Sequence, residues 1–260
     1  MNWLDKLFNK QPPETVAQSP DIPQVPPSEH AVVGKEAGAQ MLAATCAARD
    51  AFYSTLGTLD VDVLAPLVNP SFMGGPRWPS LRQAWRVIRR ADSIMIASDG
   101  LSDPVEDDDD IFEPRGHLLE VCVVFPAAAL AGQDISASWL FDLIYQVSQN
   151  VADHGSIDLL VERHGSVSLA LDLQQPPAGL ENRYEQVGVL LTWGAGQLPA
   201  QFDTPYGPVM LLVATVLQPG ELDAISDADD KAQARAVLVG QLAASPTGLM
   251  SVASRPAVTA

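Results

Sequence analysis

Cysteines and cationic residues are scarce in this chain of 260 residues. It has 2 cysteines, and its 15 lysines and arginines face 32 aspartates and glutamates, which gives a formal net charge of -17. Because phosphate binding needs a cationic surface, we expect no nucleic-acid partner. The acidity permits a basic protein partner, or it serves only solubility. Cys46 and Cys122 lie far apart in apolar contexts, which predicts two buried free thiols and no disulfide framework.

Long apolar runs are also missing. No stretch approaches the roughly 18 apolar residues of a membrane-spanning helix. The first ten residues contain neither the apolar run nor the cleavage site of a secretory signal. We therefore expect a cytoplasmic protein. Hydrophobic residues still make up 47% of the chain, which is ample for a packed core.

The first ten residues are predicted to form a short amphipathic helix. Four apolar residues recur at helical spacing and would share one face: Trp3, Leu4, Leu7 and Phe8. That face could tether the chain, as an adaptor, to a partner or a membrane surface. The alternative is that it docks on the protein's own core or that the segment is disordered. Membrane contact is expected nowhere else. Six prolines in residues 11–29 indicate an extended linker over residues 11–32.

The remaining pattern favours a single globular domain over residues 33–256, with a tail at 257–260. Helices are predicted over residues 35–56, from Ser80 through Ile88, over 138–153 and over 227–243. Strands are predicted over residues 94–97, 117–125, 167–173, 187–193, 209–217 and 249–253. Because helices and strands are interspersed without strict alternation, the expected fold is α/β of the α+β type, a mixed β-sheet with helices packed on it.

Charge is distributed unevenly before and after residue 91. Residues 63–91 contain no acid and five arginines, whereas residues 92–113 contain nine acids and no lysine or arginine. One interpretation is a bipolar surface that recognises a charged partner. The other is that the arginines neutralise the acidic segment, including Glu106–Asp110, within the same molecule.

The loop at Asp99–Asp103 is the main candidate for a functional site. Asp and Gly at a strand end tolerate unusual backbone angles, and Asp103 before Pro104 can close a turn through its side chain. The pattern predicts a rigid loop with exposed carboxylates, beside which a partner strand could add. The alternative is a hydrolase that uses Asp99, Asp103 or His117.

No metal site and no cofactor are expected. His154 and His164 lie near acidic residues, but their spacing matches no recurrent ligand pattern. The two His-Gly-Ser triplets that begin at these histidines are interpreted as strand-entry turns.

The loop also carries a family resemblance. Gly100-Leu101-Ser102-Asp103 after an apolar strand resembles the Gly-Leu-Ser-Asp signature of suppressor of fused-like domains. Further pieces follow the family order: Gly74-Gly75-Pro76, Leu119-Glu120-Val121, the helix 139–151, Thr204-Pro205-Tyr206-Gly207-Pro208-Val209, Glu221-Leu222, and Leu249-Met250-Ser251 through Arg255. The resemblance spans residues 43–255. It departs from the family at Asp92–Ile96, where the family is aromatic, and at Pro104-Val105.

The resemblance implies an α/β domain that binds a protein segment and performs no chemistry. The expected partner-binding residues are Asp99, Gly100, Leu101, Ser102 and Asp103, together with Thr204, Pro205, Tyr206 and Gly207. The second domain of the animal protein, which grips a transcription factor, has no counterpart in this sequence. The short acidic chain is similar to bacterial relatives, some of which are thought to be immunity proteins, so an immunity or regulatory role is expected.

Overall fold

A computed structural model describes residues 33–106, 112–113, 115–130 and 132–258. The predicted amphipathic helix over residues 1–10 and the linker over 11–32 lie outside these residues. So do Asp107–Asp110 of the acidic run. The hypothesis of an adaptor tethered through its N-terminal helix therefore stays a prediction.

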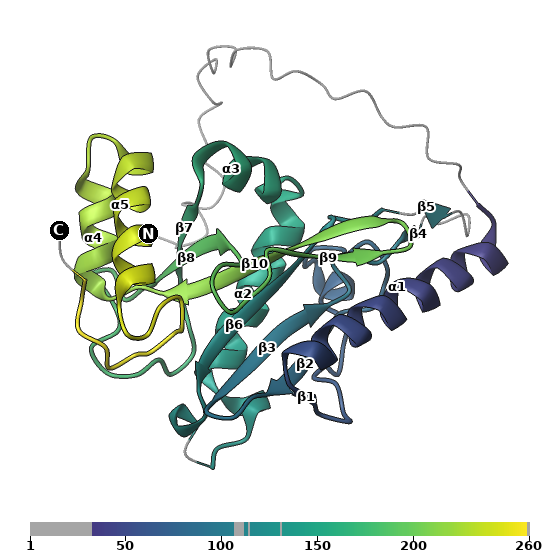
Figure 1. Cartoon of the computed structure of the whole chain (residues 1–260), viewed down its shortest axis with the longest axis horizontal. Helices are drawn as coiled ribbons and strands as arrows, with labels where there is room; N and C mark the ends of the chain where they lie inside the picture. Colours follow the sequence, from purple (N-terminus) through teal and green to yellow (C-terminus); the bar gives the residue numbers. More distant parts are fainter. Residues whose placement is uncertain (1–32, 107–111, 114, 131, 259–260) are drawn as a thin grey trace, which may run out of the picture. The chain divides into compact units, whose positions relative to one another are not determined.

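An eight-stranded mixed β-sheet forms the centre of the described domain (Figure 1). Its strand order is β1-β2-β3-β6-β10-β8-β7, and β9 pairs with β10. Within it, β6 and β10 are parallel and the other pairs are antiparallel. The strands are β1 (Thr58–Leu59), β2 (Ala84–Arg89), β3 (Ser93–Asp99), β6 (Leu119–Pro126), β7 (Val167–Leu171), β8 (Val187–Trp193), β9 (Gln201–Thr204) and β10 (Gly207–Val216), and a separate small sheet pairs β4 (Val105–Glu106) with β5 (Phe112–Glu113).

Helices cover both faces of this sheet (Figure 1). They are α1 (Lys35–Leu56), α2 (Trp139–His154), α3 (Ile157–His164), α4 (Pro219–Asp227) and α5 (Lys231–Ala244), with short 3₁₀ helices η2 (Pro70–Met73), η3 (Ala127–Ala129) and η4 (Ile135–Ala137). One face of the sheet packs on α2 and α3 in a core that includes Val123 and Val147. The other face packs on α1 through Tyr53 and on α4 and α5 through Leu222 and Leu238. The α/β fold with a mixed sheet is confirmed.

Three predictions about the elements hold. Helix α1 has the predicted bounds, and Ser138 caps α2 by accepting a hydrogen bond from the backbone N–H of Phe141. The apolar run in β10 is buried on both faces, because Leu212 packs in the core under α2 and Leu211 in the core under α1. No helix in the described ranges is both long and apolar enough to cross a membrane.

The helix predicted from Ser80 through Ile88 is wrong. Residues 84–89 form strand β2, in register with β3 from Ala84 opposite Asp99 to Arg89 opposite Ile94. Trp85 and Val87 join the core on one face of the sheet, and Ile88 joins the core on the other. The apolar residues fit helical spacing in the sequence, but in the structure successive side chains point to opposite faces of the sheet, as in any strand.

Two further local predictions need correction. The His154 triplet does not enter a strand: Gly155 ends α2 in the left-handed region (φ 70°), and α3 follows directly. Residues 249–253 are not a strand. They meet the sheet through single hydrogen bonds, such as Ser251 N–H to the Val124 carbonyl (2.7 Å).

Candidate functional site

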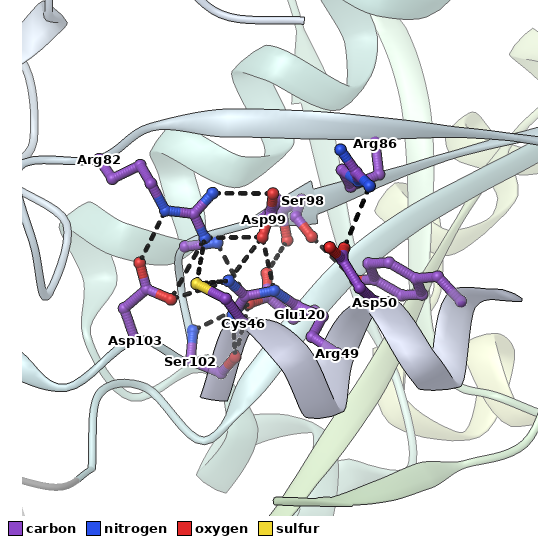
Figure 2. Close-up of polar contacts among 12 residues, drawn as sticks. Cys46, Arg49, Asp50, Arg82, Arg86, Ser98, Asp99, Ser102, Asp103 and Glu120 are labelled. Atoms are coloured by element: carbon purple, nitrogen blue, oxygen red, sulfur yellow. Dashed lines mark hydrogen bonds and ion pairs between the residues drawn. The ribbon is translucent and has the colours of Figure 1, made fainter. Parts of the chain in front are cut away.

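A buried ionic cluster lies where β2 begins, β3 ends and β6 begins (Figure 2). The antiparallel register of these strands places Asp99, at the end of β3, near Glu120, close to the start of β6. Helix α1 runs across this end of the sheet and contributes Arg49. The cluster comprises two guanidinium groups and three carboxylates: Arg49, Arg82, Asp99, Asp103 and Glu120.

Arg49 is the centre of the cluster and is fully buried. Its Nε donates to Asp99 Oδ1 (2.6 Å), and its Nη2 donates to Asp103 Oδ1 (2.8 Å). Its Nη1 donates to Glu120 Oε1 (3.0 Å) and to Ser102 Oγ (2.8 Å). Burial alone would lower the pKa of Arg49, but the charges of Glu120, Asp99 and Asp103 raise it well above the usual value. Arg49 is therefore a fixed cation that ties α1 to the loop after β3.

Arg82 binds the same two aspartates from the opposite side and is partly exposed. It makes a bidentate contact with Asp99, from Nη1 to Oδ2 (2.8 Å) and from Nη2 to Oδ1 (2.7 Å). Its Nε also donates to Asp103 Oδ2 at 3.3 Å. Burial favours a raised pKa of Asp99, but the hydrogen bonds from Arg82 and the charge of Arg49 outweigh it and lower the pKa to about 2. Asp99 is thus held as a carboxylate.

Glu120 carries the third carboxylate and is fully buried within β6. Its Oε1 accepts from Ser102 Oγ (2.6 Å) and from Ser102 N–H (3.0 Å), and its Oε2 accepts from Ser98 Oγ. Burial raises the pKa of Glu120, and the opposing charge of Arg49 does not fully offset this rise. The carboxyl group therefore connects the last strand residues of β3 to the loop that follows them.

Glycine is required at two positions around this loop. Gly100 has φ 152°, and an added Cβ would lie 2.6 Å from the Arg82 carbonyl oxygen. At Gly116, an added Cβ would lie 2.3 Å from the Asp103 carbonyl oxygen. Both contacts are with backbone atoms, which cannot move aside cheaply. These glycines let the loop pack tightly against its neighbours.

The second predicted segment, Thr204–Gly207, is the turn between β9 and β10. Thr204 Oγ1 donates to the Gly207 carbonyl (2.8 Å) and accepts from Tyr206 N–H (3.2 Å), so the turn closes on itself. Arg115 Nε donates to the Tyr206 carbonyl (3.2 Å). Two residues further on, His117 N–H donates to the Leu101 carbonyl (2.9 Å). Residues 115–117 therefore link the turn to the Asp99–Asp103 loop.

The two predicted segments differ in exposure. Asp99 and Asp103 are 5% and 0% exposed, and the three residues between them are also buried. The predicted exposure of these carboxylates is wrong, because two arginines hold them inside the domain. Pro205 is exposed, and Thr204, Tyr206 and Gly207 are half-buried. Of the two segments, only the turn is accessible to solvent.

The geometry also bears on the hydrolase alternative. The described side-chain partners of the Asp99 and Asp103 carboxylates are Arg49, Arg82 and Ser80, and none of them is a histidine. Burial lowers the pKa of His117, and the charge that opposes this shift comes from Asp158 of α3. The three residues do not converge with a base, as that hypothesis requires. Within the described ranges, no group of three His, Cys, Asp or Glu side chains could hold a metal ion.

The arginines of residues 63–91 do bind acids of the same molecule. Arg82 pairs with Asp99 and Asp103, while Arg86 pairs with Asp50 of α1 and Arg89 pairs with Asp60. Intramolecular pairing is thus confirmed for these three arginines. Arg82 binds acids of the predicted segment 92–113, whereas Arg86 and Arg89 bind acids outside it.

Sequence reasoning missed Arg49 and Glu120, although each carries a recognisable signal. Arg49 shares one face of α1 with the buried Thr45 and Tyr53 at a spacing of four residues. Glu120 interrupts an otherwise apolar strand. A charge on a buried face needs a partner of opposite charge, so both positions pointed to an internal ion pair. The predicted buried free thiol is confirmed at Cys122, whereas Cys46 is free but half-buried, 3.4 Å from Arg82 Nη2.

A second buried ion pair lies at the other end of the described chain. Arg255 contacts both oxygens of Glu221, and its Nη2 also donates to the Val216 carbonyl (3.1 Å). Glu221 in addition accepts from Gln218 N–H (2.8 Å), which completes the capping box of α4. The pair therefore attaches the C-terminal segment to the end of β10.

Fold and site together define an α/β domain in which an internal ionic cluster fixes a loop beside an exposed turn. No protein-family model matches the chain, and no curated protein matches its sequence. Among solved structures, the chain is similar to Drosophila Suppressor of Fused, with 13% identity, a TM-score of 0.38, and coverage of 64% of this chain and 39% of that one. It is also similar to a chain in the Sufu–Fu complex, with 15% identity, a TM-score of 0.44, and coverage of 84% and 91%. The chain thus spans well under half of the Drosophila protein's chain.

Proposed function

We propose that this protein is a non-enzymatic protein-binding domain that contacts its partner through the turn Thr204–Gly207, with the buried loop Asp99–Asp103 as internal support of that surface. The observation that carries the proposal is the closed ionic cluster that holds the loop Asp99–Asp103, to which residues 115–117 link the turn. Its charged groups are bound to one another, and they hold the loop in one conformation. The turn is then free to act as the contact surface.

A fixed turn suits recognition for an energetic reason. Ordering a loop upon binding costs about 0.5–1.5 kcal/mol for each immobilised side chain with many rotamers. Here the turn is already ordered by Thr204 and Arg115 in the free protein. The turn therefore loses little further conformational entropy when the partner binds.

The proposed partner is a basic protein that this domain sequesters, in an immunity or regulatory role. The net charge of -17 supports this choice, because long-range attraction raises the association rate of oppositely charged proteins. A cytoplasmic location is part of the proposal. It agrees with the two free cysteines, since thiols persist in reducing compartments.

The test is co-purification with a matched pair of variants. Tyr206→Ser removes the large side chain of the turn and leaves its backbone hydrogen bonds in place. Tyr184→Ser removes a tyrosine that is 64% exposed in another loop. We expect a specific partner that co-purifies with the wild type to be lost from Tyr206→Ser and retained by Tyr184→Ser. Retention of that partner by both variants would refute the proposed surface.

Substitution of Asp99 or Asp103 is a poor test of the same surface. Both carboxylates are buried, and removal of either would take one of three carboxylate partners from Arg49. Loss of binding would then report a loss of folding. The exposed turn gives the cleaner experiment.

A further inference from the structure

A pocket with a volume of about 360 Å³ lies between three segments that are far apart in the sequence. Its lining comes from Arg90, which lies between β2 and β3, from residues 195–198 between β8 and β9, and from residues 245–250 after α5. Pockets that bind small molecules typically have volumes of roughly 300–1,000 Å³. This pocket is therefore large enough for a small molecule.

The buried part of the lining is apolar. Val124 and Leu198 are 3% and 7% exposed and belong to the core under α1. Leu249 and Met250 also line the pocket and pack against the same core. Leu198 N–H donates to the Ala195 carbonyl (3.2 Å), which closes the loop between β8 and β9 on itself. The pocket is thus formed in the free chain, and its buried side suits an apolar ligand body.

Arg90 supplies the charge of this pocket. It is half-buried, and the described lining residues include no acid. The side-chain hydrogen bond of Arg90 is long, from Nη2 to Gln197 Oε1 at 3.5 Å. Arg86 and Arg89 are paired with aspartates, whereas no acid of the described ranges, Asp92 included, forms an ion pair with Arg90. The Arg90 guanidinium is therefore available to an anionic group.

A carboxylate matches this cation better than a phosphate. The planar guanidinium of arginine binds a carboxylate through two parallel hydrogen bonds. One arginine balances the single charge of a carboxylate, whereas a phosphate monoester carries about 1.5–2 negative charges. The net charge of -17 makes any excess negative charge on a ligand unfavourable. The ligand that fits both parts of the lining therefore carries one carboxylate on an apolar body.

We propose that the pocket binds a small monocarboxylic acid, with its carboxylate on Arg90 and its apolar body against Val124 and Leu198. This inference goes beyond the proposed function because no described lining residue belongs to the turn Thr204–Gly207 or to the ionic cluster. It would hold even if the turn bound no protein. A ligand that binds only the folded chain also raises its thermal stability, which gives a second readout.

The experiment titrates octanoate into the ¹⁵N-labelled full chain and follows the backbone amide signals of Gly196 and Gly248, which line the pocket. The neutral comparison probe is 1-octanol, which has the same number of carbons without the charge. Three forms of the chain are compared: the wild type, Arg90→Met, and the control Arg89→Met, whose arginine pairs with Asp60 outside the pocket.

We expect saturable shifts of both signals in the wild type, with a Kd for octanoate of about 1 mM or lower. Arg90→Met should raise this Kd at least about tenfold, because the carboxylate loses its charged hydrogen-bond donor, and Arg89→Met should leave it unchanged. The wild type should bind 1-octanol at least about tenfold more weakly than octanoate.

Several results would overturn the proposal. These are no saturable shift at Gly196 or Gly248, equal Kd values for octanoate and 1-octanol, and equal weakening in Arg90→Met and Arg89→Met. Tighter binding of octyl phosphate than of octanoate would make the ligand a phosphate and overturn the choice of a carboxylate. If Arg90→Met alters the thermal unfolding curve, Ala243→Trp places a bulky side chain in the lining instead. It should abolish the shifts, and octanoate binding that persists in this variant would contradict the assigned pocket.

Discussion

Replacing Arg49 by methionine removes the central cation of the cluster and keeps a side chain of similar length. Glu120 then loses its guanidinium partner, while Asp99 and Asp103 keep Arg82. Removing one partner of a buried ion pair costs about 3–5 kcal/mol, because the remaining charge is left uncompensated. Since all four hydrogen-bonded partners of Arg49 named above are buried, we expect a loss in this range. Urea unfolding measures it as a lower midpoint with an unchanged slope.

Arg86→Met is the matched control. Arg86 pairs with Asp50 at 3.2 Å, and the Asp50 side chain is 48% exposed. An ion pair open to solvent contributes less than about 1 kcal/mol, so the control loses much less stability. Adding Glu120→Gln to Arg49→Met should recover about 1–2 kcal/mol, because the unpaired carboxylate is gone. Equal losses in Arg49→Met and Arg86→Met would refute the assignment of Arg49 as the structural centre.

Three further predictions concern the same end of the sheet. The pKa of Asp99 is lowered from 3.8 to about 2 in the folded state. Above pH 3.8 the ionised carboxylate of Asp99 therefore contributes about 2 kcal/mol to the free energy of unfolding, and this contribution is lost as the pH falls to about 2. Asp99→Asn should remove this part of the pH dependence of the urea midpoint. Gly100→Ala should destabilise the fold by about 1–3 kcal/mol, because an added Cβ meets backbone atoms there. The control Gly240→Ala, in α5 where a Cβ meets nothing, should stabilise the fold by about 0.5–1 kcal/mol. Similar shifts of the thermal midpoint in the two variants would contradict the close packing at Gly100. Burial raises the pKa of Cys46 against the opposing charge of Arg82, so its alkylation by iodoacetamide at neutral pH should be slower than that of a free thiol, and a faster reaction would be inconsistent with the cluster.

Local patterns were sufficient to predict several elements. Helix α1 follows from its alanine-rich sequence and Gly57, and α2 follows from Ser138 and a regular apolar stripe. Strand β10 follows from an apolar run bounded by a turn and Pro219. In each case the deciding interactions lie within the segment or depend only on burial.

The errors arose where distant residues decide the structure. Residues 84–89 could satisfy helical spacing on their own, and only pairing with β3 makes them a strand. The carboxylates of Asp99 and Asp103 belong in the interior because Arg49, some 50 residues earlier, reaches them from α1. Local sequence cannot supply such a partner. An arginine on the apolar face of a predicted helix, together with a glutamate in an apolar strand, nevertheless indicates a buried ion pair. This combination can be searched for in a sequence.

The central claim is that the turn Thr204–Gly207, fixed by Thr204 and Arg115, is the surface that meets a protein partner. Hydrogen exchange of the free chain and of its complex with a co-purified partner tests this most directly. We predict that binding adds protection at backbone amides of Thr204, Tyr206 and Gly207, and leaves the loop around Tyr184 unchanged. A complex that adds no protection at the turn would contradict the claim.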